Sequence, residues 1–446
     1  MNRVAAKDQL IEKLNQRTAT IAVVGLGYVG LPLACALAEA GHRVIGIDSS
    51  LDKVEGVNAG KSHIDDVPSA QVRRLVGDHN IRATTDYEAA RTCDAAIIAV
   101  PTPIDEYRIP DLSFVRSAAI SLSQVMPKGS LVVLESTTYP GTTEEVIVTA
   151  FRNRGYMPGV DIFIGYSPER IDPGNANWNI HNTPKIVCGL TKNCLEVLIA
   201  LYSTFVEKLV PVSNIRTAEI TKLFENIFRG VNIALVNEFQ VICDAFDIDV
   251  WEVIQACSTK PYGFTPFYPG PGLGGHCVPV DPFYLAWKAR EKNVNTEFIE
   301  LSGRVNASMP AYVVGKTAKL LNTNRKSLNG ARVGLLGVAY KKNSSDVRES
   351  PAIKLIELLL EEGAIVSYHD PHVLSLRVGS QTMRSVRGGR DFLDSLDCAI
   401  VVADHDSIDW TLVLEFAPMI VDTRNVLGRL SPMSARSSNR VERRAE

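Results

Sequence analysis

Residues 20–50 read TIAVVGLGYVGLPLACALAEAGHRVIGIDSS, and this stretch decides the fold of the first part of the chain. A β-branched run leads through three glycines into a segment with helical spacing, which stops at Gly41 before a second β-branched run. A pattern that changes from strand to helix and back to strand predicts a βαβ unit. Such units build parallel sheets, so we expect an α/β fold here.

The turn between the first strand and the helix has the pattern Gly25-x-Gly27-x-x-Gly30, and Asp48 ends the second strand. Glycines allow a tight turn and let the backbone approach a pyrophosphate, which the positive end of the helix attracts. A carboxylate about 20 residues further on accepts hydrogen bonds from the ribose and repels a 2′-phosphate. The pattern therefore predicts a dinucleotide site that favours NAD over NADP, in preference to a glycine turn without a ligand.

Composition is that of a globular chain of several domains. The 446 residues include 47 Lys+Arg and 50 Asp+Glu, a net charge of -3, with 46% hydrophobic residues. At roughly 150 residues per domain the length allows two to four domains, and the charge balance gives no reason to expect nucleic acid as a partner.

Cysteine usage and the N-terminus predict a cytoplasmic protein. The eight cysteines include no C-x-x-C pair, which is typical of reduced thiols. The first 20 residues lack the apolar core of a signal peptide, and glycines and Pro32 interrupt the uncharged stretch 21–38. We therefore expect neither export nor a membrane span.

Further strand-like runs organise the rest of the chain into a predicted fold of two Rossmann-like doubly wound α/β domains, joined by a long central helix within a helical middle domain. DAAIIAVPTP, SLVVLESTTYPG, DIFIGYSPER and KIVCGL extend the first sheet. Residues 217–246 predict one long, mostly buried helix, and ARVGLLG, AIVSYHDP, CAIVVADH and PMIVDTRN predict a second sheet. The expected domains are 1–210, 211–325 and 326–428, followed by a disordered tail at 429–446.

A long loop between these domains is dense in Pro, Gly and aromatic residues: TKPYGFTPFYPGPGLGGHCVPVDP, residues 259–282. Loops of this length inside globular chains are usually functional. Gly274 and Gly275 let a ligand approach Cys277, and a helix that begins at Asp281 would stabilise its thiolate. A lone cysteine is more often a small buried hydrophobe, so the nucleophile hypothesis depends on this setting. No spacing around His276 predicts a metal site, and we interpret the cluster at 369–372 as a strand end.

Two polar features accompany the loop. Lys222 and Asn226 lie four apart on the predicted long helix, where a lysine and an amide suit the stabilisation of an oxyanion. The alternative is a surface ion pair of Lys222 with Glu219 or Glu225.

Glu169, in YSPER, follows a predicted strand end, where active-site groups of α/β sheets gather. Its alternative role is an ion pair with Arg170.

At these residues the chain resembles the UDP-glucose/GDP-mannose dehydrogenase family over nearly its full length. The match rests on GLGYVGLPLA, the strand end Glu135-Ser136-Thr137, SPER, AEITKLFEN, GGHCVPVD and SSDVRESPA, in the family's order. SPERIDPGN, FYPGPGLGGHCVPVDPFYL and KKNSSDVRESPA look most like the bacterial UDP-N-acetylglucosamine 6-dehydrogenases of surface-polysaccharide synthesis, such as that of capsule and lipopolysaccharide O-antigen. UDP-glucose dehydrogenases usually carry a G-Y-C-F-type sequence where this chain has G-H-C-V.

The resemblance implies an NAD-dependent, four-electron oxidation of the C6 hydroxyl of a UDP-sugar to a carboxylate, through a thiohemiacetal and a thioester on Cys277. It implies that Lys222 and Asn226 stabilise oxyanions and that Asp281 orients a water or assists proton transfer. Glu169 matches the carboxylate associated with thioester hydrolysis, and Thr137 the hydroxyl that helps to hold the water.

The resemblance also implies binding residues. For the cofactor these are Gly25, Gly27, Tyr28, Val29, Gly30, Asp48, Lys53, Thr102, Thr137 and Arg348. For the UDP-sugar these are Glu169, Lys222, Asn226, Tyr268, Gly272, Gly274, Tyr340, Lys341 and Arg424. An ion pair with Glu349 or Asp346 remains the alternative for Arg348. The resemblance makes 326–428 the UDP-sugar domain and 211–325 the dimerisation domain, so a homodimer or higher homo-oligomer is expected.

Three other hypotheses stay open at this point. The same chemistry on UDP-N-acetylmannosamine or UDP-glucose differs in only a few loop residues. A two-electron hydroxyacid dehydrogenase needs neither a nucleophilic thiol nor a second α/β domain. A catalytically silent NAD-binding protein would not need the Lys222, Asn226, Cys277 and Asp281 set.

Overall fold

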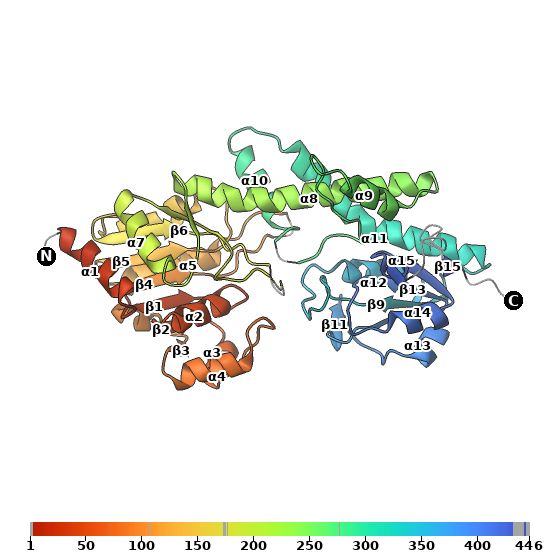
Figure 1. The fold of residues 1–446 in the computed structure, drawn as a ribbon, viewed down its shortest axis with the longest axis horizontal. Helices are drawn as coiled ribbons and strands as arrows, with labels where there is room; N and C mark the ends of the chain where they lie inside the picture. Colours follow the sequence, from red (N-terminus) through yellow and green to blue (C-terminus); the bar gives the residue numbers. More distant parts are fainter. Residues whose placement is uncertain are drawn as a thin grey trace. The chain divides into compact units, whose positions relative to one another are not determined.

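The computed structural model describes residues 3–105, 107–172, 175, 177–275, 277–430 and 441–442. The chain divides into two compact units, which Figure 1 shows. The first comprises residues 1–225 and 283–295, and the second residues 226–282 and 296–446.

The first unit is built on an eight-stranded sheet in the order β3-β2-β1-β4-β5-β6-β7-β8. Strands β1 to β6 are parallel, β7 is antiparallel to β6, and β8 is parallel to β7. The strands are β1 (Thr20–Val24), β2 (Arg43–Ile47), β3 (Ile81–Thr84), β4 (Ala95–Ile98), β5 (Ser130–Leu134), β6 (Ile162–Tyr166), β7 (Lys185–Gly189) and β8 (Leu209–Pro211). This order confirms the predicted doubly wound sheet.

Helices cover the sheet because its strands are apolar along nearly their whole length. The apolar residues of α1, α2 and α7 form one core with alternate residues of β1, such as Ile21 and Val23. The helical elements are α1 (Arg3–Asn15), α2 (Gly30–Glu39), α3 (Leu51–Asn58), α4 (Ser69–Gly77), the 3₁₀ helix η1 (Tyr87–Thr92), α5 (Ser113–Val125), the π-helix η2 (Thr143–Val148), α6 (Thr149–Arg152) and α7 (Lys192–Tyr202).

The predicted long helix is α8 (Ile215–Ala245), and its 31 residues span about 46 Å. Leu223, Ile227 and Ala234 are buried, but Phe224 and Leu235 are 64% and 62% exposed. The expectation of a mostly buried helix is therefore wrong for one face, because packing within the chain covers only the other. The helices that follow are α9 (Val250–Ser258), α10 (Asp281–Arg290) and α11 (Glu297–Thr323).

The second unit contains a five-stranded sheet in the order β10-β9-β13-β14-β15, parallel except for β15. The strands are β9 (Arg332–Leu336), β10 (Ile365–His369), β13 (Cys398–Val401), β14 (Met419–Asp422) and β15 (Val441–Glu442), with a hairpin of β11 (Ser375–Val378) and β12 (Gln381–Arg384). The helices are α12 (Pro351–Glu361), α13 (Arg390–Asp394), α14 (Trp410–Phe416) and α15 (Val426–Leu430). The second predicted α/β domain is thus confirmed.

The predicted tail is described only in part. Residues 429–430 end α15 and residues 441–442 pair with β14, whereas 431–440 and 443–446 lie outside the described residues. Within the described ranges, no helix has the length and apolar character that a membrane span needs.

Candidate active site

The glycine turn after β1 is shaped for close approach of a ligand. Gly25 has φ +92°, and a Cβ there would lie 2.6 Å from the Ala99 carbonyl oxygen. A Cβ on Gly30, at the start of α2, would lie 1.7 Å from the Gly25 oxygen. A Cβ on Gly27, in contrast, would meet no described atom within 4 Å. The turn therefore demands glycine at two positions and leaves open space at the third, where a pyrophosphate can approach α2.

Tyr28 is partly exposed on this turn, and Val29 is the residue that precedes α2.

Asp48 lies next to the glycine turn, at the end of β2. Its Oδ2 accepts a hydrogen bond from the Leu26 amide (2.8 Å) and its Oδ1 one from the Ser50 amide (2.9 Å). The Lys53 ammonium lies 3.4 Å from Oδ2. An acidic side chain is thus fixed at the end of β2 beside the open Gly27, which fits the ribose and pyrophosphate of NAD.

Two threonines lie at the ends of neighbouring strands of the same sheet. The Thr102 hydroxyl, after β4, donates to the Thr137 carbonyl, after β5, at 2.8 Å. The hydroxyl of the next residue, Thr138, is buried and has no hydrogen-bond partner among the described residues. The sequence analysis named Thr102 and Thr137 but not Thr138, whose buried hydroxyl is a polar group that a water molecule could bind.

Glu169, after β6, belongs to a buried ionic network that sequence reasoning missed. The Lys185 ammonium lies 3.2 Å from Glu169 Oε2 and 3.4 Å from Glu135 Oε1. The Lys185 side chain is 6% exposed and that of Glu135 0%. Tyr202 donates its hydroxyl hydrogen to Glu135 Oε1. The only sequence signal was a lysine placed at the first residue of an otherwise apolar strand.

This network sets the charges around Glu169. Burial raises the pKa of Glu169, but the Lys185 charge and the Ile171 amide outweigh it, so that the pKa is lowered overall. Burial raises the pKa of Glu135 above its usual value. Lys185 has a raised pKa because its two carboxylate partners outweigh its burial. Glu169 is therefore held as a carboxylate, the form that a general base requires.

The alternative ion pair for Glu169 does not form, since the Arg170 guanidinium binds Glu225 at 2.6 Å.

The alternative role of Lys222 is also contradicted by the structure. Lys222 is buried, not at the surface. Glu219 accepts hydrogen bonds from the Gly141 amide (2.5 Å) and the Thr143 amide (2.9 Å), while Glu225 binds Arg170. Both carboxylates thus have other partners, and Lys222 remains a candidate for the chemistry, because its charge also lowers the pKa of Glu169.

In the second unit the structure brings Asn226, Asp281 and Cys277 together. The Asn226 amide donates to Asp281 Oδ2 at 2.5 Å, and both side chains are buried. The Asp281 amide donates to the Cys277 carbonyl at 2.8 Å in the turn before α10. Cys277 is exposed and forms no disulfide, as a nucleophile must be. The predicted start of a helix at Asp281 is confirmed, whereas His276 lies outside the described residues.

The loop before Cys277 packs tightly against Tyr340. A Cβ on Gly274 would lie 2.5 Å from Tyr340 Cβ, and one on Gly275 would lie 2.8 Å from its ring. Gly275 also donates its amide hydrogen to the Arg348 carbonyl at 3.0 Å. Gly272, with φ +133°, lies against Pro351. Glycine is needed along this loop so that the backbone can reach Tyr340.

The remaining predicted substrate residues also lie in the second unit. Tyr268 is largely exposed and stacks on Trp251, with ring centroids 5.6 Å apart. Arg424 donates from Nε to the Val402 carbonyl (2.8 Å), and its guanidinium lies against Gly270. Lys341, next to Tyr340, is half-buried.

Arg348, predicted to contact the cofactor, forms the ion pair that was its alternative. Its Nη2 lies 2.6 Å from Asp346 Oδ2. The Arg348 side chain is nevertheless 41% exposed, so the ion pair leaves part of it accessible to solvent.

Three family models match consecutive parts of the chain. They describe the UDP-glucose/GDP-mannose dehydrogenase family: its NAD-binding domain at residues 19–206, its central domain at 216–308 and its UDP-binding domain at 334–429.

Known relatives cover most of the chain. A UDP-N-acetyl-D-mannosamine dehydrogenase of Methanococcus maripaludis is 34% identical over 91% of this chain and 93% of the relative. A UDP-N-acetyl-D-glucosamine 6-dehydrogenase of Pseudomonas aeruginosa is 37% identical over 79% of this chain and 83% of the relative. The structure of a UDP-D-ManNAc dehydrogenase from Pyrococcus horikoshii is similar, with a TM-score of 0.83 and 31% identity over 91% of this chain and 95% of that one.

These matches confirm NAD as the cofactor and a UDP-sugar as the class of substrate. They explain why a dinucleotide turn and a second α/β domain occur in one chain. The chain belongs to the UDP-glucose/GDP-mannose dehydrogenase family, a family of NAD-dependent nucleotide-sugar dehydrogenases.

Proposed function

We propose that this chain oxidises the C6 hydroxyl of UDP-N-acetylglucosamine to the uronic acid, as a step in the synthesis of surface-polysaccharide precursors. The observation that carries the proposal is Cys277, exposed on a glycine-rich loop and joined through Asp281 to Asn226. A two-electron alcohol oxidation needs no thiol, whereas in a four-electron oxidation a thiol can hold the aldehyde as a thiohemiacetal for the second oxidation.

Each candidate residue has a role that its chemistry suits. NAD⁺ would supply the hydride acceptor, with a fresh molecule bound for each of the two oxidations. Cys277 sulfur bonds to the aldehyde carbon as a thiohemiacetal, which becomes a thioester after the second oxidation. Lys222 and Asn226 stabilise the negative oxygens of these steps. Glu169 takes a proton from the water that attacks the thioester, and cleavage of the carbon–sulfur bond then releases the acid and the thiol.

Asp281 orients Asn226 and assists proton transfer in this scheme, and Thr137 helps to hold the water. The cofactor is held at the glycine turn by Asp48 and its neighbours, which are described above.

The experiment that tests the proposal counts NADH formed per UDP-sugar consumed. Purified protein is offered UDP-N-acetylglucosamine, UDP-N-acetylmannosamine and UDP-glucose in parallel. Two NADH per sugar with the first substrate alone supports the proposal, whereas one NADH would contradict the role of Cys277. A Cys277→Ala variant is the matched control: it should lose turnover and still bind NAD⁺ with the wild-type affinity.

UDP-N-acetylmannosamine is the second candidate substrate. Relatives of that name cover more than nine-tenths of this chain, including the one from Methanococcus maripaludis. The two sugars differ in the configuration at C2, which is far from the reacting C6 and is read by loop contacts. The same NADH count distinguishes them, because only the true substrate should give two NADH at low concentration.

We also propose a cytoplasmic homodimer that pairs through the exposed apolar face of α8. All eight cysteines are outside disulfides, which suits a reducing compartment. A light-scattering mass measurement tests the dimer, and Leu235→Glu should shift it to the monomer mass. The exposed apolar residues are Ile220, Phe224, Phe228, Leu235, Phe239, Val241 and Ile242.

The domain roles follow the three matched family models. We propose cofactor binding at residues 1–210, dimerisation and the nucleophile at 211–325, and UDP-sugar binding at 326–428.

A further inference from the structure

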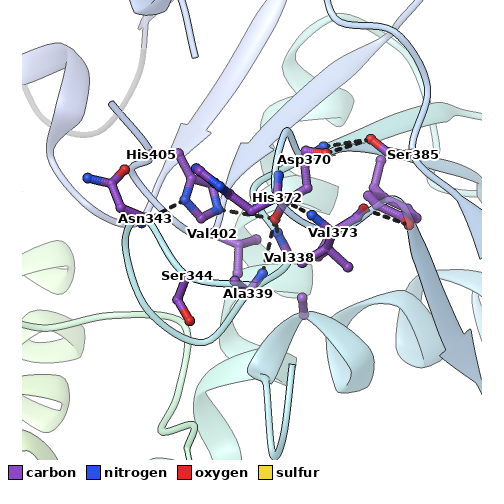
Figure 2. Close-up of polar contacts among 12 residues, drawn as sticks. Val338, Ala339, Asn343, Ser344, Asp370, His372, Val373, Ser385, Val402 and His405 are labelled. Atoms are coloured by element: carbon purple, nitrogen blue, oxygen red, sulfur yellow. Dashed lines mark hydrogen bonds and ion pairs between the residues drawn. The ribbon is translucent and has the colours of Figure 1, made fainter. Parts of the chain in front are cut away.

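A buried carboxylate marks the end of β10 in the second unit (Figure 2). Asp370 is 1% exposed and accepts amide hydrogen bonds on both oxygens. Oδ2 binds the amides of Val338 (2.6 Å) and Ala339 (3.2 Å), and Oδ1 binds those of His372 (2.8 Å) and Val373 (3.0 Å). Although burial raises its pKa, these amides and His405 lower the pKa of Asp370 to about 2. The group is therefore a carboxylate under physiological conditions.

His405, which follows β13, has one tautomer that its partners determine. Its Nδ1 lies 2.9 Å from the Asn343 amide nitrogen, which can only donate. Nδ1 is therefore the acceptor, and the ring hydrogen is on Nε2, which donates to Asp370 Oδ2 at 3.1 Å. The ring is fully buried and packs against the His372 ring, with centroids 4.8 Å apart. Both ring nitrogens of His405 thus have protein partners, and of the two histidines at 369 and 372 it is His372 that packs against the ring.

These two residues hold a short segment of chain at both ends. Asp370 binds the segment at Val338 and Ala339, and His405 binds it at Asn343 (Figure 2). Since Asp370 and His405 are bonded to each other, the contacts form a closed ring that includes residues 338–343. Asn343 has φ +56°, a left-handed conformation that asparagine adopts more readily than most residues, and its side chain also exchanges two hydrogen bonds with Asp406 (2.7 and 2.9 Å).

The held segment carries two predicted substrate residues, Tyr340 and Lys341. The Tyr340 amide is fixed by the Asp346 carbonyl at 3.0 Å. Its side chain packs against Gly274 and Gly275 of the loop that leads to Cys277. A change at Asn343 therefore reaches the nucleotide-binding residues and the nucleophile loop through a few direct contacts.

We propose that His405 is a positioning residue for the UDP-sugar: its Nε2–H tautomer ties Asn343 to Asp370 and thereby holds segment 338–343 in the conformation that binds uridine diphosphate. The inference rests on the proposed function of Tyr340 and Lys341 in that site. In this role His405 does not contact the substrate. Its contribution is a segment that is ordered before the ligand arrives, so that binding does not have to order it.

Two substitutions separate the two hydrogen bonds of the ring. The Asn oxygen in His405→Asn occupies nearly the place of Nδ1 and keeps an acceptor for the Asn343 amide. The Gln nitrogen in His405→Gln occupies nearly the place of Nε2, keeps a donor for Asp370 and leaves the Asn343 amide without its partner. Both variants replace the ring by a side-chain amide, so loss of the ring packing alone would not weaken UDP binding selectively in H405Q.

The experiment is calorimetric titration of wild type and both variants with UDP, with NAD⁺ titrated as a control. A buried amide left unpaired should weaken UDP binding by H405Q about tenfold. H405N should weaken it less, by about threefold, because it loses the bond to Asp370 but keeps the bond to Asn343, and NAD⁺ affinity should be unchanged in both variants. Equal UDP affinities for H405Q and wild type overturn this inference and leave the proposed function intact. Failure of the wild-type protein to bind UDP overturns the proposed function as well.

Hydrogen exchange in the wild-type protein tests the same inference without any variant. The Asn343 amide should be protected in the absence of UDP, because His405 already binds it. Exchange of this amide at the rate of an open loop overturns the inference, even where H405Q does not fold.

Discussion

Replacing Lys185 by Met removes the cation from a buried network and leaves two carboxylates without it. Glu135 and Glu169 have their nearest oxygens 3.4 and 3.2 Å from the Lys185 ammonium, and all three side chains are largely withdrawn from water. Breaking a buried ion pair on one side costs about 3–5 kcal/mol, because the remaining charge has lost its compensation.

Protonation of a glutamate sets an upper limit on the free-energy cost of K185M. A glutamate that has lost its cation can take up a proton instead. From an ordinary pKa of about 4.3, this costs about 3.7 kcal/mol at pH 7 but only about 1 kcal/mol at pH 5. In the wild-type protein the pKa of Glu169 is lowered, so its contribution to stability is lost as the pH falls. In K185M the pKa of Glu169 would be raised, so the free energy of unfolding would fall as the pH rises. The destabilisation by K185M should therefore be about 3–4 kcal/mol at pH 7 and smaller by about 2–3 kcal/mol at pH 5.

Urea unfolding of wild type and K185M at the two pH values measures this difference. The matched control is Lys128→Met, because Lys128 pairs with Asp161 at a similar distance, 2.9 Å, but is 67% exposed. The control should lose less than about 1 kcal/mol. Equal losses for the two variants, or a K185M loss that does not change with pH, would refute the buried-network argument.

The other predictions concern glycines and one more buried acid. Gly30→Ala places a Cβ 1.7 Å from a backbone oxygen and should cost about 3 kcal/mol of stability. The Cβ of Gly27→Ala meets no described atom, so this variant should unfold like wild type. It should nevertheless raise the KM for NAD⁺ about tenfold. Gly274→Ala forces Tyr340 aside and should raise the KM for the UDP-sugar about tenfold with a smaller effect on kcat; an unchanged KM would contradict it. Burial raises the pKa of Glu219 to about 7, so relative to Glu219→Gln the wild-type stability should be highest below about pH 4.5 and should fall by about 3 kcal/mol as the pH rises to 7, which unfolding titrations across this range measure.

Much of the fold could be predicted from local patterns. The βαβ unit of residues 20–50, the later strand runs and the limits of α8 to within two residues were all readable, because the period of apolar residues reports which face is covered. The outward face of α8 could not be predicted. An apolar residue that packs inside the chain and one that awaits a partner look the same in sequence.

The candidate site shows the same division. The Gly25 turn with Asp48, and Cys277 before a helix start, follow from spacing, since their chemistry depends on near neighbours in the chain. Spacing also named Lys222, Asn226 and Glu169, and the family resemblance gave them roles, but the sequence could not exclude a surface ion pair for Lys222. The structure rules out this ion pair because Glu219 and Glu225 have other partners.

By itself, then, the sequence determined the order of elements, the dinucleotide turn and the glycine-rich loop that leads to Cys277, all of which depend on residues close together in the chain. Only the tertiary structure decided the partners of buried charges: Lys185 lies 16 residues from Glu169 but on the neighbouring strand, and His405 lies 35 residues from Asp370. A charge in a low-dielectric interior is stable only beside its compensating group, and that group is chosen by the packing of strands and not by spacing along the chain.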